Sequence, residues 1–465
     1  MNVRASSRST RLAVPVMLAM APLLAVAGCA PGGSADAPAA TGAAPSAAET
    51  KAVNTDPAAM GNVTLTVWDQ EVRGGGNAQL TKLNADFQKK YPNITIKRNS
   101  RSFDDLVKTL RLALSGNDAP DIVQANNTRS QMGEFVKAKQ IIPLDPYMKA
   151  YGWDKRYSES IRSVVSYSAD GKTFGSGNLY GMPQVGEVVG VFVNSKKLEA
   201  LGLEKPNTWA DFEKALETAK SKGETPLMLG NLDKWPAVHV FGAIQGQYVP
   251  ADQIRALGFG NAGANWKTPE NTKAAQTLVD WAGKGYFNEG FNGLGYDPAW
   301  QAFSKGTGVF LIGGTWLQAD LSKAMGADVS FMLPPPKDAG GTTYTTGASG
   351  QPFAITAKAK NPDAAAAYIN YLTTPEAMAI IAETENLPVV DTAAQKAPNA
   401  LGQQVFEAFG KAASDNGLLP YLDWATPSMA DTIGGALQDL LAKKQTPEQV
   451  LDTLQKDYAD FTGQG

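Results

Sequence analysis

The sequence contains one histidine and one cysteine in 465 residues. A serine triad would have to use His239, and no G-x-S-x-G elbow occurs. There is also no H-E-x-x-H motif, no Cys/His metal cluster, no EF-hand loop and no phosphate-binding G-x-x-x-x-G-K-[ST] loop. We therefore expect no catalytic residues, no metal and no cofactor, and any ATPase that works with this chain must be a separate protein.

Strong charge of either sign is lacking too. The formal net charge is −3, and the 42 basic and 45 acidic side chains are spread along the chain. Nothing resembles the basic stripe that nucleic acid requires, so no nucleic-acid partner is expected. After residue 61 no apolar run approaches the length of a transmembrane span.

The N-terminus carries the clearest targeting signal. Three arginines precede an apolar run, Leu12–Ala27, which two prolines interrupt and which is too short to span a bilayer comfortably. The run ends in Val-Ala-Gly-Cys29, which resembles the lipobox of bacterial lipoproteins. That resemblance implies that residues 1–28 are a signal peptide and that Cys29 carries a lipid. The alternative is a plain signal peptide with a leftover thiol, but a lone secreted cysteine otherwise needs an explanation.

The lipidated Cys29 and the following segment, together 29–60, are expected to form a flexible tether. Residues 30–60 contain no Leu, Ile, Phe, Tyr or Trp, so they cannot bury enough surface to fold. We therefore expect a protein held by lipid on the extracellular face of the cell membrane, without spanning it.

Strands and helices alternate from residue 61 onward. Val63–Val67 has the alternation of a strand, Ala78–Lys90 that of an amphipathic helix, and Ile94–Lys97 and Ile122–Val123 complete a β–α–β–α–β series. Short links between such elements indicate a parallel sheet flanked by helices.

Later segments repeat this alternation. Glu187–Val193 is a nearly continuous apolar run typical of a strand buried on both faces, and Val309–Ile312 and Gln351–Thr356 also have strand patterns. The pairs Asn361-Pro362 and Thr446-Pro447 place a capping residue before proline at the first position of a helix.

Several stretches in the right order resemble the extracellular sugar-binding proteins of ABC importers, the family that includes maltose-binding protein. The resemblance covers essentially residues 61–465. The stretches are LTVWDQ, KKYPNITIK, SGNDAPDIV, IIPLDPY, NLYGMPQVGEVVGVFVNSKKLEALGLEKPNTWADF, FSKGTGVFLIGGTW and PFAITAKAKNPDAAAAYINYLTTPEA.

The resemblance implies an α/β, two-lobed, periplasmic-binding-protein-like fold of type II. Each lobe would be a mainly parallel sheet flanked by helices, with the ligand in the cleft between the lobes. Chain crossings near Pro183–Val188 and Val329–Pro334 would act as hinges. The implied boundaries are 61–185 and 328–390 for the first lobe, and 186–327 and 391–465 for the second.

The resemblance also implies a function. A monomer would capture a sugar, with an oligosaccharide expected, by closing its lobes, and would deliver it to the membrane permease subunits of an ABC transporter. A secreted carbohydrate-active enzyme is the alternative, because a glycosidase needs only two carboxylates. A lipid-anchored sensor or scaffold without transport is a third reading.

A sugar site needs carboxylate or amide side chains around the hydroxyl rim and aromatic rings on the sugar face. Loops at the carboxyl ends of strands are where such cleft ligands bind. For the loop at 69–76, a solvated turn with a helix cap at Asn77 is the alternative. The candidates on these loops are Asp69, Gln70, Glu71, Arg73, Asn126, Asn127, Arg129, Ser349 and Gln351.

Two further candidates match ligand-contacting positions of the family. Glu187 is a lone carboxylate in an apolar strand, where the alternative is a glutamate on the hinge surface. Trp316 follows two glycines that make room at its face, and the alternative is a tryptophan that caps the core. Relatives often have a tryptophan where this chain has Ala125, which is a departure from a maltose-like pose.

The last candidates come from the presumed second lobe. They are Asp233, Trp235, Asp423 and Trp424. Other rings are expected to have structural roles. We expect Trp209 and Trp281, on helical segments, to be packing residues, Trp153 to lie at the surface, and His239 to lie in the core or at the surface.

Overall fold

The computed structural model describes residues 52–260 and 262–463. The predictions for residues 1–28 and for Cys29 lie outside these residues. Ala52–Gly465 forms one compact unit. The tether was predicted to extend to residue 60, but the end of that segment is attached to the folded body. The backbone of Asn54 donates to Asp363, Asn93 donates to the Pro57 carbonyl, and Pro57 is buried.

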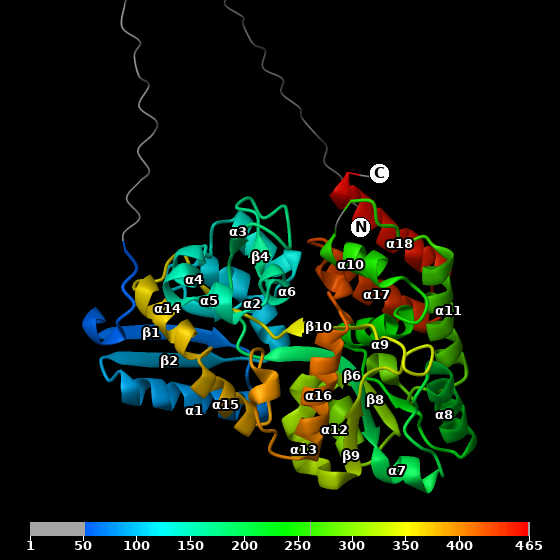
Figure 1. Cartoon of the computed structure of the whole chain (residues 1–465). Helices are drawn as coiled ribbons and strands as arrows, with labels where there is room; N and C mark the ends of the chain where they lie inside the picture. Colours follow the sequence, from blue (N-terminus) through cyan, green and yellow to red (C-terminus); the bar gives the residue numbers. More distant parts are fainter. Residues whose placement is uncertain (1–51, 261, 464–465) are drawn as a thin grey trace, which may run out of the picture. The chain divides into compact units, whose positions relative to one another are not determined.

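The first sheet has four strands in the order β11-β3-β1-β2 (Figure 1). β1 is parallel to β2 and β3, and β11 is the antiparallel edge. The predicted β–α–β–α–β series therefore exists. Its elements are β1 (Val63–Asp69), α1 (Gly74–Lys90), β2 (Ile94–Ser100), α2 (Phe103–Ser115) and β3 (Ile122–Gln124). The fourth strand of the sheet, β11 (Phe353–Ile355), comes from later in the chain.

Helix α1 begins earlier than the sequence pattern predicts. The glycines at 74–76 are not a loop before the helix but its first turn. A Cβ at Gly75 would lie 2.5 Å from the Ala319 side chain, and one at Gly76 would lie 2.2 Å from the Glu71 carboxylate. Only glycine allows the start of α1 to approach these neighbours so closely.

The second sheet has six strands. The main path is β12-β10-β6-β8-β7, and β9 pairs with β6 as well. β6 runs antiparallel to β8, β9 and β10, so this sheet is mixed in its pairing, although its other strands share one direction. The strands are β6 (Gly186–Asn194), β7 (Leu227–Met228), β8 (Phe310–Gly314), β9 (Val329–Met332), β10 (Thr345–Ser349) and β12 (Leu418–Leu419).

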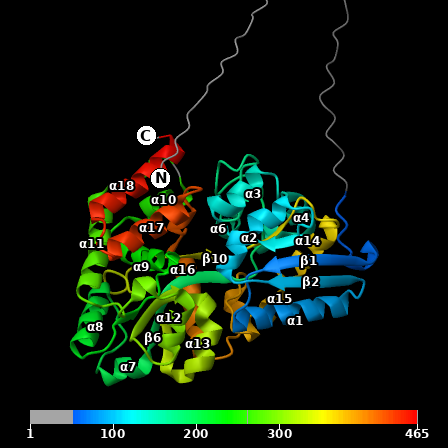
Figure 2. The same cartoon turned by 180° about the vertical axis from the view of Figure 1, so that it is seen from behind.

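The chain returns from the second sheet to the first later than the sequence predicts. β9 and β10 pair with β6, so residues 329–349 belong to the second sheet rather than to a first lobe that resumes at 328. The chain returns to the first sheet between Ser349 and β11. β6 itself, which starts within the first predicted crossing, runs from one group of elements into the other (Figures 1 and 2).

Helices cover both sheets, and the two groups are visible from either side in Figures 1 and 2. Around the first sheet lie α3 (Glu134–Lys137), α4 (Asp145–Tyr151), α5 (Trp153–Arg156), α6 (Glu159–Ser163), the strand pair β4 (Ser166–Tyr167) and β5 (Asn178–Leu179), α14 (Pro362–Tyr371) and α15 (Pro375–Glu383). Around the second lie α7 (Ser195–Ala200), α8 (Trp209–Ser221), α9 (Trp235–Gln245), α10 (Ala251–Phe259), α11 (Pro269–Gly283), α12 (Tyr296–Ser304), α13 (Gln318–Met325), α16 (Ala400–Ser414), α17 (Met429–Leu441) and α18 (Pro447–Thr462).

Local capping signals are only partly realised. Thr446 makes the full reciprocal capping box with Gln449, whereas the Asn361 side chain makes no capping hydrogen bond. Trp209 and Trp281 are buried and stack at 5.6 Å, as packing residues should. Trp153 was placed at the surface, but it is fully buried and donates to Asn370 at 3.0 Å, because α14 covers it.

In the part of the chain that the structure describes, no helix combines the length and the apolar character needed to cross a membrane.

Candidate functional site

One pocket is lined by residues from both lobes, where the first lobe is the four-stranded sheet with its helices and the second lobe is the six-stranded sheet with its helices. It encloses about 1160 Å³ of empty space, including open solvent at its mouth. Its lining residues are Gln70, Glu71, Arg73, Gly76, Gln79, Phe103, Asn126, Asn127, Val185, Gly186, Glu187, Trp235, Val238, His239, Thr315, Trp316, Ser349, Gln351, Asn386, Leu387, Tyr421, Asp423 and Trp424.

An ion pair beneath the pocket fixes the loop after β1. Arg98 on β2 donates to both carboxylate oxygens of Asp69, at 2.7 and 2.8 Å, and Asp69 is fully buried. The same two side chains hold the backbone of Glu71, whose N–H donates to Asp69 and whose carbonyl accepts from Arg98. Asp69 therefore positions Glu71 and does not line the pocket.

The Glu71 side chain is held by a buried amide on the neighbouring strand. Gln124 at the end of β3 donates to the Glu71 carboxylate at 3.0 Å and accepts from the Gln70 backbone at 2.9 Å. Burial raises the pKa of Glu71 above its ordinary value, and the nearby Asp69 carboxylate adds to the rise. A polar ligand group that could hydrogen-bond this carboxyl would relieve its desolvation.

Arg73 reaches across the mouth of the pocket. Its guanidinium donates to Asp297 at 2.9 Å, and Asp297 belongs to α12 of the second lobe. The same guanidinium lies 5.7 Å from the centre of the Tyr296 ring. This ion pair links the two lobes at the rim, although half of the Asp297 side chain is exposed, which limits its strength.

Glu187 lies on β6, at the place where the chain passes between the lobes. Its carboxylate accepts a long hydrogen bond of 3.4 Å from the Tyr421 hydroxyl. Burial raises the pKa of Glu187 to about 8, and the charge of Glu71 adds to the rise. A Cβ at Gly350 would lie 2.9 Å from this carboxylate, so the glycine leaves the space that the side chain occupies.

Trp316 follows β8 and is one of several rings on the second-lobe side of the pocket. Its indole N–H donates to the Tyr296 hydroxyl at 2.6 Å. A Cβ at Gly314 would come within 1.9 Å of the Trp316 ring, so this glycine makes room for the ring where it lies. The predicted role of the glycine pair is confirmed for Gly314 in this respect.

Trp235 and His239 extend the same ring cluster from α9. Trp235 lies 4.3 Å from Tyr296, and His239 lies within 6 Å of Trp235, Trp316 and Tyr421, all between ring centres. Burial lowers the pKa of His239 to about 3, so the ring is neutral at physiological pH. The histidine predicted to be a plain core or surface residue lines the pocket instead.

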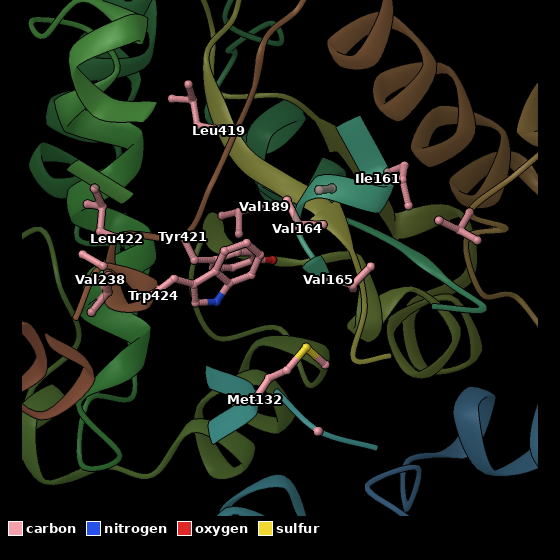
Figure 3. Close-up of a cluster of buried hydrophobic side chains, with 14 of the residues drawn as sticks. Met132, Ile161, Val164, Val165, Val189, Val238, Leu419, Tyr421, Leu422 and Trp424 are labelled. Atoms are coloured by element: carbon pink, nitrogen blue, oxygen red, sulfur yellow. The ribbon is translucent and has the colours of Figure 1, made fainter. Parts of the chain in front are cut away.

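Residues after β12 complete this wall. Figure 3 shows the Tyr421 and Trp424 rings close together, with Val238 and Leu422 beside them, and the ring centres are 4.9 Å apart. Trp424 is only 3% exposed, so most of its surface packs in the core. Burial raises the pKa of the neighbouring Asp423 to about 6.

The remaining predicted residues at the pocket come from two segments, one that follows β3 and one at the end of β10. The Asn127 amide donates to the Val164 carbonyl at 2.6 Å, and the side chain is almost fully buried. Asn126, one residue earlier, is more exposed. Ser349 and Gln351 flank the return crossing, and the Gln351 carbonyl accepts from Gln124 at 3.5 Å.

Besides Asp69, two predicted residues do not line the pocket. Arg129 points away because the chain turns into a short helical segment there, and its guanidinium donates to the carbonyls of Lys172 and Phe259. Asp233 accepts from the Tyr296 backbone at 2.8 Å and so caps the start of α12. Both residues hold elements around the site in place.

Several lining residues had not been proposed from the sequence. The polar and aromatic ones are Gln79, Phe103, His239, Thr315, Asn386 and Tyr421. For Gln79 a signal exists, because Leu83 and Phe87 follow it four and eight residues later on the buried face of α1. Tyr421 is two residues before Asp423 and could have been added on that ground.

Among residues 52–260 and 262–463, no group of three or more His, Cys, Asp or Glu side chains is placed to hold a metal ion.

Comparison with protein families identifies a match over most of the folded body. Residues 73–379 match the model described as "Bacterial extracellular solute-binding protein". A relative called "Multiple sugar-binding protein", from Streptococcus mutans, is 25% identical over 329 residues, which cover 67% of this chain and 72% of the relative.

Solved structures share the fold. A protein described as a chitin oligosaccharide binding protein superposes with a TM-score of 0.73 at 22% identity, over 86% of this chain and 99% of its own. The bacterial solute receptor AcbH, described as preferring β-D-galactopyranose, gives a TM-score of 0.74 at 19% identity, over 86% of this chain and all of its own. At these identities the likeness concerns the fold, which is the expected two-lobed α/β fold of type II.

Proposed function

Because this chain belongs to the bacterial extracellular solute-binding proteins, we propose that it captures a sugar, most simply a short oligosaccharide, in the pocket between its lobes. The sugar is then passed to the membrane permease of an ABC importer whose ATPase is another chain. The ligand contacts come from Gln70, Glu71, Arg73, Asn126, Asn127, Glu187, Trp235, Trp316, Ser349, Gln351, Asp423 and Trp424.

The observation that carries this proposal is the pairing of chemistries in one pocket. Carboxyl and amide groups on one side suit a rim of hydroxyls, and the rings on the other side suit the apolar face of a pyranose. Relatives named for sugar binding support the same choice. Of the residues that line the described pocket, Arg73 alone is a lysine or arginine, and it is paired with Asp297. The one cation of the described pocket lining is therefore already paired, and none is left to pair with the carboxylate of an acidic sugar.

Capture by lobe closure follows from how the chain crosses between the lobes. The hinges are the start of β6 and the return between β10 and β11, and the Arg73–Asp297 pair forms only when the lobes approach. On this account the first lobe resumes at about residue 351. The protein acts as a monomer.

The test is a thermal-shift panel on the full chain in detergent. Chitin oligosaccharides, raffinose and galactose are compared with galacturonic acid. A sugar well above its Kd should add about 2–4 kcal/mol of apparent stability, whereas the acid should add none. No shift with any neutral sugar, or a shift with the acid alone, would refute the proposal.

A glycosidase also needs two carboxyls, and Glu71 and Glu187 lie in one pocket. We propose binding without turnover. Incubation of the chain with the sugar that stabilises it best, followed by chromatography, should return the sugar unchanged. Release of shorter products that disappears in the Glu187→Gln variant would establish the enzyme instead.

We further propose that the signal is cleaved before Cys29 and that this cysteine carries a lipid that anchors the protein outside the cell. In the native host, Cys29→Ser should move the protein from the membrane fraction to the soluble fraction with its sugar affinity intact. A Cys29→Ser protein that stays with the membranes would show that something other than this lipid holds it.

A further inference from the structure

Gln79 is a buried amide that no part of the described chain satisfies. It lies in the second turn of α1, its side chain lines the pocket, and the residue is 1% exposed. Neither Oε1 nor Nε2 has a hydrogen-bond partner among the described residues. The positions four and eight residues later, Leu83 and Phe87, are apolar and fully buried.

An amide in this situation is costly to the folded protein. A buried polar group without a partner loses its hydrogen bonds to water and gains none in return, whereas an apolar group of similar shape would bear no such penalty. Folded proteins leave few such groups, so each one calls for a reason. Packing does not supply one here, because Leu83 and Phe87 are apolar and the other long buried polar side chain of α1, Asn84, has its own partner in Tyr368.

Other polar atoms without partners among the described residues lie around the same pocket. They are Arg73 Nε in the first lobe and, in the second, Ser349 Oγ, His239 Nδ1 and Trp235 Nε1. The second-lobe atoms come from β10 and α9, whereas Gln79 comes from α1 in the first lobe. A hydroxyl group can donate to one of these atoms or accept from another. Several hydroxyls on one ligand would therefore satisfy the set.

We infer that Gln79 is a sugar-binding residue whose side chain makes two hydrogen bonds with neighbouring hydroxyls of the ligand. Its Oε1 accepts from one hydroxyl, and its Nε2 donates to the next one on the same ring. This assignment rests on the proposed function. It adds selectivity for the arrangement of two adjacent hydroxyls, because a sugar that lacks one of them leaves half of the amide unsatisfied.

Gln79→Met tests the assignment because it should move two measurements in opposite directions. The melting temperature of the ligand-free full chain should rise by about 1–3 °C, since an unsatisfied amide is replaced by an apolar chain of similar length. The affinity for the sugar should fall about tenfold or more by calorimetry, since two hydrogen bonds are lost.

Gln318→Met is the matched control. Gln318 is also fully buried, with both amide atoms unpartnered among the described residues, but it lies on α13 and does not line the pocket. Its replacement should raise the melting temperature and leave the sugar affinity unchanged. A loss of affinity in both variants would show a general packing effect and overturn the assignment.

Gln79→Leu, which is shorter, gives a second reading of the same position. Unchanged affinity in Gln79→Met and Gln79→Leu, while the wild type binds sugar, would overturn the assignment and leave the proposed function standing. If neither variant folds, the amide is a structural requirement of α1, and the assignment fails as well. If the wild type itself binds no sugar, the proposed function fails.

Discussion

The pocket has a polar wall, made by first-lobe residues together with Glu187 of β6, and a ring wall from the second lobe, and the two are held in place in different ways. On the polar wall, hydrogen bonds and ion pairs fix each group, as Arg98, Asp69 and Gln124 fix Glu71. On the ring wall, close backbone contacts and ring packing do most of this, as Gly314 and Trp235 do for Trp316, which makes one hydrogen bond, to Tyr296. The affinity for sugar should therefore depend on pH through the carboxyls of the polar wall, and on the shape of the sugar through the ring wall.

The largest effect is expected on the ring wall. Trp316→Ala should weaken sugar binding by about 1–3 kcal/mol, which is roughly 5- to 150-fold, because it removes a desolvated aromatic contact. Calorimetry measures the affinity, and ligand-free melting reports any loss of stability. A stable Trp316→Ala protein with wild-type affinity would reduce this ring to a packing residue.

A backbone change should reproduce that result without removing the ring. Gly314→Ala places a Cβ within 1.9 Å of the Trp316 ring and must displace it, so affinity should fall at least several-fold. Gly283→Ala is the control, because a Cβ there has no neighbour within 4 Å. Equal affinities for the two variants would mean that the position of the ring does not matter.

A smaller effect, and one that depends on pH, is expected at Glu187. Burial and the Glu71 charge raise its pKa to about 8 from an ordinary 4.5, while Arg73 and Tyr421 oppose the rise. Below about pH 4.5 the group is protonated in both the folded and the unfolded state. Between about pH 4.5 and pH 8 the unfolded state has released this proton while the folded state still holds it, so the stability contribution of the group falls across this range and is lost by about pH 8.

Glu187→Gln removes that dependence. The ligand-free variant should match the wild type near pH 5 and melt at a higher temperature than the wild type near pH 9. Its affinity for sugar should fall by no more than about tenfold, because one acceptor is kept. A melting difference that is the same at both pH values would contradict the raised pKa of Glu187.

The smallest effect is expected where the walls meet at the rim. Arg73→Gln and Asp297→Asn each break a half-exposed ion pair, which is worth about 0–1 kcal/mol. Sugar should dissociate up to about fivefold faster from Asp297→Asn at low salt, and the difference should shrink in 1 M salt. A large loss that persists at high salt would mean that Asp297 contacts the sugar directly.

Much of the fold follows from local pattern. The first β–α–β–α–β series, the apolar strand β6 and the caps at Thr208 and Thr446 are set by neighbouring residues, and the structure has them. The place of β9 and β10 is not local, because their partner strand β6 lies more than a hundred residues earlier in the chain. The sequence therefore put the second crossing about twenty residues too early.

The residues of the candidate site show the same division between those that a local pattern predicts and those that depend on distant parts of the chain. Glu187 could be predicted because a lone charge interrupts an apolar strand, and Trp316 because glycines precede it. Asp233 could not be placed, since it caps a helix that starts 63 residues later. His239 could not be placed either, because α9 is apolar nearly all round and its sequence does not indicate which face meets the pocket.

The most direct measurement is a crystal structure of the full chain in complex with the sugar that stabilises it best, with no detergent bound in the pocket. The account predicts a pyranose ring stacked on Trp316 or Trp235, with its hydroxyls within hydrogen-bond distance of Glu71 and Glu187. A sugar bound outside this pocket, or one in it that touches only the rings or only the carboxyls, would contradict the two-wall account.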